Sequence, residues 1–115
     1  MEEYSIQIRF KQALDKADSL DKIAEKLSGD VVDDIDDLSR KISTNWTGEN
    51  SKKYLNKVVS TEEDIKNLAT NVKRVASTIR AIAQEIYEAE MKALELARTR
   101  EAYLLAQQSQ TTGNM

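Results

Sequence analysis

The sequence predicts an all-α protein, an antiparallel helix-turn-helix hairpin that dimerises into a four-helix bundle. Its composition is typical of long helices, because proline is absent, glycine occurs three times and charged residues make up 32% of the 115 positions. Apolar residues recur every seven positions in two long stretches. Residues 44–48 form the break between these stretches, and a short connection between helices favours an antiparallel hairpin.

The first helix is expected from about residue 5 to residue 43. Ser28, Gly29 and Asp30 weaken it locally, since a glycine inside a helix costs about 1 kcal/mol relative to alanine. The heptad phase continues through Gly29, so we expect a bend or a close contact there; a true break of the helix is the alternative. One apolar column is Phe10, Ala17, Ala24, Val31 and Leu38, and the second is Ala13 or Leu14, Leu20, Leu27, Ile35 and Ile42.

The second helix is expected from about residue 49 to residue 107 and carries the longer heptad pattern. A row of small residues beside its columns allows a neighbouring helix to approach closely and favours a bundle of more than two helices. One column is Val58, Ile65, Val72, Ile79, Ile86 and Ala93; the other is Tyr54, Thr61, Leu68, Val75, Ile82, Ala89, Leu96 and Tyr103; the small row is Ala69, Ala76, Ala83 and Ala97.

The ends of the two helices follow from local composition. Gly48 supplies the backbone freedom that a tight turn requires, and Thr47 or Gly48 is expected to cap the second helix. Residues 109–115 are polar and are predicted to form a flexible tail. The sequence thus predicts a helical hairpin over residues 1–108, with its turn at 44–48.

Charge pairing predicts the register of the hairpin. A fold at Thr47 places Asp37 near Lys57, Asp21 near Lys73 and Asp15 near Arg80. In this register Ser5 lies near Ala89, and the apolar residues beyond Ala89 lack a partner within the hairpin. Unpartnered apolar surface usually marks an association site, and a second copy would cover part of it. The candidate partner-binding residues are Leu94, Leu96, Tyr103, Leu104 and Leu105.

Residue types exclude several kinds of chemistry. Histidine and cysteine are absent, which removes the commonest nucleophile–base pairs and thiolate zinc sites. We therefore expect no enzyme, no catalytic residue, no cofactor and no metal. Asp30, Asp33, Asp34 and Asp37 share a helical face that could attract a divalent cation, but a solvated face is favoured. The net charge of −3 argues against a nucleic-acid partner.

The residues Trp46-Thr47-Gly48 lie between two helices, with Tyr54 shortly after the turn. In this position they resemble the motif of the WXG family of small type VII (ESX/Ess) secretion substrates, the early-secreted-antigen-like proteins of Gram-positive bacteria and mycobacteria. The resemblance covers nearly the whole chain. It implies that Trp46 and Gly48 shape the turn. It also implies that the protein forms a homodimer, or pairs with a related WXG or LXG helical protein, as a four-helix bundle.

The resemblance also implies an export signal near the C-terminus, of the form Tyr-x-x-x-Asp/Glu. The match is imperfect, because the acid after Tyr87 is Glu90, one position early, and Tyr103 is followed at that spacing by Gln107. A looser family pattern has a hydrophobic residue, an acid four positions later, and hydrophobic residues three and seven positions beyond the acid. The export signal candidates are Ile86, Tyr87, Glu90, Ala93 and Ala97.

The leading hypothesis is a secreted WXG-type effector or export partner, which also contacts the type VII secretion ATPase. No apolar stretch is long enough to span a bilayer and the acidic start is unlike a Sec signal peptide, so we expect export from the cytoplasm without one. The alternative is a cytoplasmic coiled-coil adaptor, or a chaperone-like helper for a larger helical toxin. Two further interpretations are less favoured. Lys73, Arg74 and Arg80 could bind an acidic partner, and residues 91–105 could form a helix that lies on a membrane surface.

Overall fold

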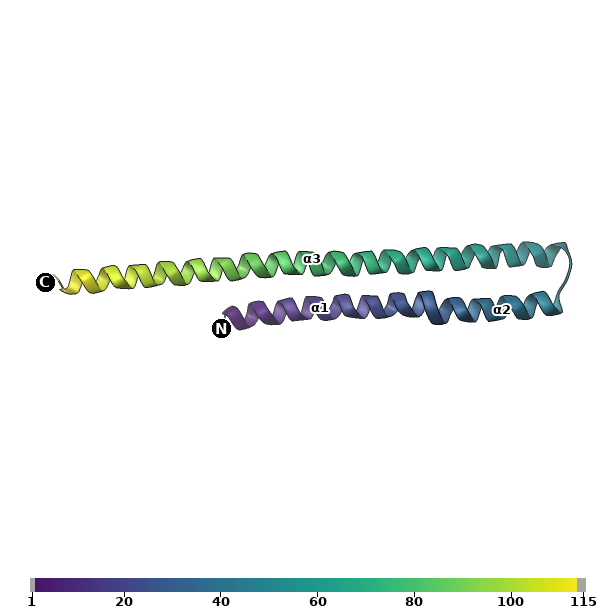
Figure 1. The fold of residues 1–115 in the computed structure, drawn as a ribbon, viewed down its shortest axis with the longest axis horizontal. Coiled ribbons are helices and arrows are strands. Elements are labelled where there is room, and N and C mark those ends of the chain that lie inside the picture. Colours follow the sequence, from purple (N-terminus) through teal and green to yellow (C-terminus); the bar gives the residue numbers. More distant parts are fainter. Residues whose placement is uncertain (1, 114–115) are drawn as a thin grey trace. The chain divides into compact units, whose positions relative to one another are not determined.

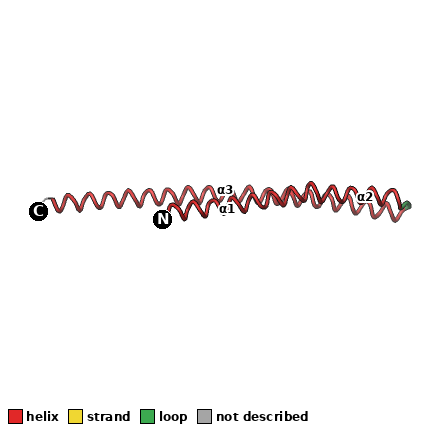
Figure 2. The backbone as a smooth tube through the Cα atoms, turned by 90° about the horizontal axis from the view of Figure 1, so that it is seen from below, coloured by secondary structure: helices red, strands yellow, loops and turns green. Residues whose placement is uncertain are grey.

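The computed structural model describes residues 2–113 and confirms the all-α helical hairpin. Helix α1 spans Glu2–Lys26, a π-helical turn η1 spans Leu27–Val31, α2 spans Val32–Asn45 and α3 spans Glu49–Gly113. The described residues contain no β-strand. Figures 1 and 2 show the loop between α2 and α3, with helix on both sides of it. Dimerisation stays a prediction.

The helices are longer than the sequence predicts. The first arm begins at Glu2 and ends at Asn45, so the turn shrinks to Trp46–Gly48. Helix α3 continues through Ser109, where a flexible tail was predicted, and ends at Gly113. Asn114 and Met115, the last two residues of that predicted tail, lie outside the described residues. The tail residues up to Gly113 therefore extend α3.

The chain divides into two compact units, which are described separately. The turn unit is Asp15–Ile79, and it contains η1, α2 and the loop. The terminal unit combines Met1–Leu14 with Arg80–Met115, and so holds the start of α1 and the later part of α3.

The π-helical turn of the turn unit shifts the phase of the first arm by one residue. Ala24 is fully buried, and the next buried residue is Val32, eight positions later. The predicted continuation of the heptad through Val31 and Leu38 is therefore wrong, and Leu38 is 50% exposed. Gly29 neither breaks the helix nor makes a close contact, since a Cβ built there meets nothing within 4 Å. A π turn accommodates one additional residue in a continuous helix.

Small side chains form the core of the turn unit. On the first arm the buried residues are Ala17, Ala24 and Val32; on α3 they are Ala69 and Ala76, together with Ser51 near the turn. The small row thus lies at the centre of the contact, and the column beside it is less covered, with Leu68 and Val75 about half exposed. Among the described residues no large side chain is fully buried.

The terminal unit has larger core residues. Ile6 of α1 and Ala83 of α3 are buried. The rings of Phe10 and Tyr87 stack, with centroids 4.6 Å apart. Within this unit α3 extends past the first residues of α1 towards the C-terminus (Figure 1).

Candidate partner-binding surface

The Trp-Thr-Gly turn is built from backbone geometry. Trp46 is extended, with φ −138° and ψ 120°, and its backbone N–H still donates to the Ile42 carbonyl at 2.9 Å. Gly48 has φ +113°, a conformation that L side chains rarely adopt. Its carbonyl accepts the Ser51 hydroxyl at 2.8 Å and the Lys52 backbone N–H at 3.2 Å, which begins α3. Glycine is therefore required here by the backbone and not by packing, because a Cβ would meet no neighbour.

Trp46 packs against its own hairpin and also faces solvent. Its ring lies 5.9 Å from that of Tyr54, at an interplanar angle of 52°. Both rings remain about 45% exposed. A neighbouring groove of about 280 Å³ is lined by Ile35, Leu38, Tyr54, Lys57, Val58 and Thr61. The turn thus presents an aromatic edge beside a shallow apolar groove.

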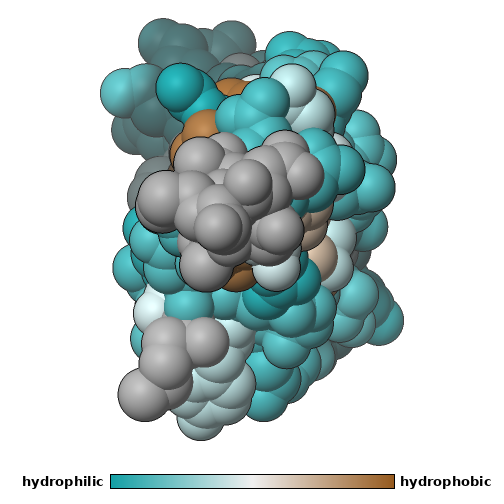
Figure 3. Space-filling view, turned by 90° about the vertical axis from the view of Figure 1, so that its left-hand side faces the viewer, coloured by the Kyte–Doolittle hydropathy of each residue, from teal (hydrophilic) through white to brown (hydrophobic). Residues whose placement is uncertain are grey.

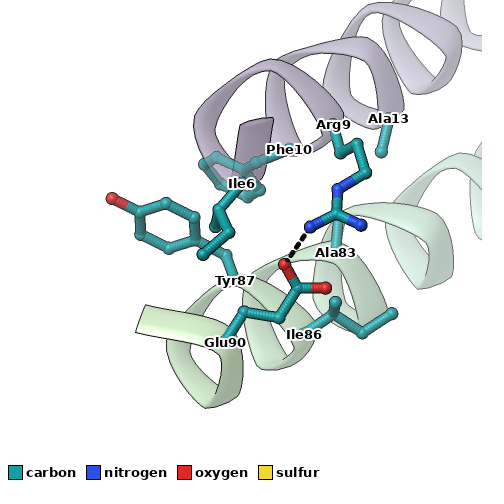
Figure 4. A pocket seen from close by; sticks show the side chains of 8 residues that line it. All are labelled: Ile6, Arg9, Phe10, Ala13, Ala83, Ile86, Tyr87 and Glu90. Carbon is teal, nitrogen blue, oxygen red and sulfur yellow. Dashed lines mark hydrogen bonds and ion pairs between the residues drawn. The ribbon is translucent and has the colours of Figure 1, made fainter. Parts of the chain in front are cut away.

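The export candidates of the terminal unit gather around a groove between α1 and α3. Figure 4 shows Tyr87 and Glu90 of α3 facing Phe10 and Arg9 of α1. The groove has a volume of about 220 Å³, and Ile86 and Ala83 complete its α3 wall. Arg9 Nη2 donates to Glu90 Oε2 at 2.7 Å. The structure therefore brings Ile86, Tyr87 and Glu90 together, with Tyr87 and Glu90 already engaged by α1.

The register differs from the one that charge pairing predicts. Ser5 lies beside Ala93 and Leu94 in a second groove, also lined by Ala97, and not beside Ala89. Arg98 Nη2 donates to Glu3 Oε2 at 3.2 Å, so the arms still meet at residue 98. The expectation that Ala93, Leu94 and Ala97 lack partners is therefore wrong. The unaccompanied part of α3 starts after Arg98 and extends roughly 20 Å at 1.5 Å per residue.

One of the three predicted charge pairs can be compared with the structure. Asp37 is paired with Arg40 of its own helix, at 3.2 Å, and no contact between Asp37 and Lys57 is seen. Asp36, one residue earlier, interacts with Glu62 of α3. Hydrogen bonding between the two carboxyl groups, loss of solvent around Glu62 and the charge of Asp36 raise the pKa of the Glu62 carboxyl, while Lys66 lowers it in part. The pairs of Asp21 with Lys73 and of Asp15 with Arg80 stay predictions.

Four of the five predicted partner-binding residues are well exposed. Leu96 and Tyr103 are 62% exposed, Leu105 is 58% and Leu104 is 50%. Leu94 is half-buried and lines two grooves. Figure 3 looks onto this end of the molecule, where brown apolar areas interrupt a mostly hydrophilic surface. The C-terminal part of α3 thus presents apolar side chains to solvent.

A second exposed surface of the terminal unit lies on the predicted heptad columns of α3. It follows the heptad columns of α3 on the flank of the helix beside the buried Ala83. Ile82 and Ile86 are about half exposed, and Ala89 and Ala93 are also exposed. We call this surface the α3 seam; its residues are Ile82, Ile86, Ala89, Ala93, Leu96 and Tyr103. The heptad pattern identified these residues, but it does not tell which column another helix covers.

The acidic side chains do not form a metal-binding cluster in the described part of the chain. Among residues 2–113, no three acidic side chains lie close enough to hold a metal ion, and this includes the Asp30–Asp37 face. No helix in the described part of the chain is long and apolar enough to cross a membrane.

No known relative adds to this geometry. Comparisons with protein-family models, with curated proteins and with solved structures find no match.

Proposed function

We propose that this chain is a WXG-type helical protein of a type VII secretion system, an effector or an export partner, which acts by binding other helices. The observation that carries the proposal is the incomplete core. Buried side chains are mostly alanine, while isoleucine, leucine, valine and tyrosine side chains of α3 stay about half exposed. Each buried methylene contributes about 0.8 kcal/mol, so covering these side chains with a partner would add substantially to stability.

The turn supports the family context of the proposal. A glycine at φ +113° directly follows Trp46-Thr47 and begins the second helix. Trp46 remains 45% exposed beside Tyr54, which leaves its ring available to a partner such as the secretion ATPase. The Trp-Thr-Gly motif is short, but its position in the loop between two helices makes the resemblance to the family more specific.

A second candidate function is favoured by the position of Glu90. This acid follows Tyr87 by three residues, and both side chains are engaged by α1 through the ion pair with Arg9 and the stack with Phe10. An export signal held in this way is less accessible to a receptor. The chain would then act in the cytoplasm as a coiled-coil adaptor or chaperone-like helper, or leave the cell on a partner's signal.

Detection in the culture medium tests the proposal. The tagged chain is expressed in a Gram-positive host with an active type VII secretion ATPase, and in the same host with an inactive ATPase. We expect the protein in the medium of the first strain alone. Glu90→Ala should reduce export at least tenfold if Glu90 belongs to the signal, while Glu88→Ala, a matched change at an exposed acid, should not.

The opposite result has a clear meaning. If the protein stays in the cell with an active ATPase, and coexpressed WXG or LXG partners of that host do not bring it out, the secretion proposal fails. The cytoplasmic adaptor then becomes the better explanation.

A further inference from the structure

We infer that the first arm of the hairpin has a second packing state, and that the π-helical turn η1 switches the arm between the two. In the observed packing, called the π state, Val32 and Ser39, seven positions apart, face α3. In the other packing, called the α state, η1 becomes α-helical and the residues one position earlier, Val31 and Leu38, face α3. Both states belong to the hairpin itself, whatever its cellular function.

The apolar pattern of the first arm fits the α state as well as the π state. A π turn holds one residue more than an α-helical turn, so its loss turns α2 by about 100° and moves it roughly 1.5 Å along its axis. Steps of seven from the fully buried Ala24 then bring Val31 and Leu38 onto the face that contacts α3. Ile35 and Ile42, half-buried in the π state, lie near that face in both states.

The π state leaves two neighbouring side chains in unfavourable surroundings. Leu38 is 50% exposed. The Ser39 hydroxyl is buried and has no hydrogen-bond partner among residues 2–113, which costs free energy. The α state exchanges the two positions, because Leu38 then packs on α3 and Ser39 turns towards solvent.

A carboxylate opposes the α state. Asp34 is exposed in the π state. It lies four residues before Leu38, on the same side of the helix, and therefore turns towards α3 together with it. Removing a carboxylate from water is unfavourable. Each state thus has one favourable and one unfavourable contact, as a bistable element requires.

The packing around η1 leaves the turn free to change. None of its residues Leu27–Val31 is buried, and a Cβ built on Gly29 meets nothing within 4 Å. The fully buried Ala17 and Ala24 lie before η1, so the core between α1 and α3 stays in place and only α2 has to turn. Single π turns within α-helices are frequent at functional sites.

The switch controls the apolar surface beside the Trp-Thr-Gly turn. In the π state Leu38 lines the groove of about 280 Å³, together with Tyr54 and Val58. In the α state Leu38 moves onto α3, so the groove loses this wall. A ligand that binds in the groove therefore selects the π state.

Deletion of Gly29 provides the first test. It removes the additional residue, so a continuous α-helix keeps Val32 and position 39 against α3 and the α state is lost. In the full chain, Ser39→Asp should select the α state and lower the melting temperature by less than about 3 °C. In the deletion chain the same substitution buries a carboxylate and should lower it by more than about 10 °C. Similar losses in the two chains would overturn the inference.

Methyl relaxation dispersion on the full-length protein provides the second test and needs no deletion. The methyl groups of Val31, Val32 and Leu38 should exchange between two environments on the microsecond to millisecond timescale. Leu38→Ser should abolish this exchange, because the α state then buries no leucine. Val59→Ser, at a comparably exposed residue of α3, should keep it. Absence of exchange at all three residues, or exchange that Leu38→Ser leaves unchanged, would overturn the inference.

Discussion

The turn unit and the terminal unit each hold two helical segments together, but with different side chains. In the turn unit the fully buried residues are alanines, and the segments are joined by the loop at Trp46–Gly48. In the terminal unit the segments are far apart in sequence, and Phe10 stacks on Tyr87 while Arg9 and Arg98 form ion pairs across the groove. Loop-closure entropy rises with chain separation, so contacts far from the turn must offset a larger cost.

The two units also differ in how much apolar surface they leave open to a partner. Close packing of small residues around the turn leaves little room for change, whereas the terminal unit has grooves on both sides of Glu90 and a column of half-exposed apolar residues. We therefore expect substitutions in the turn unit to act mainly on folding. Substitutions on the seam of the terminal unit should act mainly on binding.

The largest effect is expected where the alanine core is overfilled. Ala76 has no exposed surface, so Ala76→Leu must push the two segments apart and should lower the free energy of unfolding by about 2–3 kcal/mol. Ala81→Leu, on an exposed position of the same helix, should change it by less than about 0.5 kcal/mol. Urea unfolding followed by circular dichroism measures both. Equal stability of the two variants would mean that the alanine row is not the core.

The two glycines of the turn unit provide a matched pair. Gly48→Ala should destabilise the fold by about 1–3 kcal/mol, because φ +113° is strained for a residue with a Cβ. Gly29→Ala should be neutral or stabilise by up to about 1 kcal/mol, since Gly29 is helical and a Cβ there meets no neighbour. Thermal unfolding compares them. If Gly29→Ala were the more harmful change, the π-helical turn at Leu27–Val31 would depend on its glycine, and the loop at Trp46–Gly48 would not.

The aromatic stack should matter only for the terminal unit. A double-mutant cycle with Phe10→Ala and Tyr87→Ala should give a coupling energy of about 0.5–1.5 kcal/mol, as expected for an aromatic pair. Amide hydrogen exchange should quicken in residues 2–14 and stay unchanged near the turn. A coupling energy near zero would show that the two rings contribute independently.

The smallest effect concerns pH and the turn unit. The pKa of Glu62 is raised above its ordinary value of 4.5 by Asp36, so the folded protein binds more protons than the unfolded chain between that value and the raised one. Stability contributed by this group therefore falls as pH rises through this window. Glu62→Gln should remove this dependence of stability on pH. Unfolding midpoints of the wild-type protein and the variant, measured from pH 4 to 7, would show the difference. Identical slopes would show that the two carboxyls do not interact.

Much of the fold could be predicted from the sequence, because hairpin and turn follow from local composition. The π-helical turn was missed although the sequence carries a signal for it: Leu27 and Ile35 are eight residues apart, not seven. The predicted ion pairs assumed a fold at Thr47, whereas the pairs Arg9–Glu90 and Arg98–Glu3 place the start of α1 beside a later part of α3 than that fold predicts. The site was harder to predict, because periodicity identifies apolar columns but not which one a neighbouring helix covers. Ile82 and Ala83 are adjacent in sequence, yet Ile82 is half exposed and Ala83 is buried.

The central claim is that the terminal unit presents the α3 seam to a partner helix. A methyl NMR titration with a synthetic amphipathic helical peptide tests it most directly. The methyl signals of Ile82 and Leu96 should shift on saturation, while those of Ala69 and Ala76, buried in the turn unit, should stay in place. Shifts confined to the turn unit, or no shift at saturating peptide, would contradict the claim.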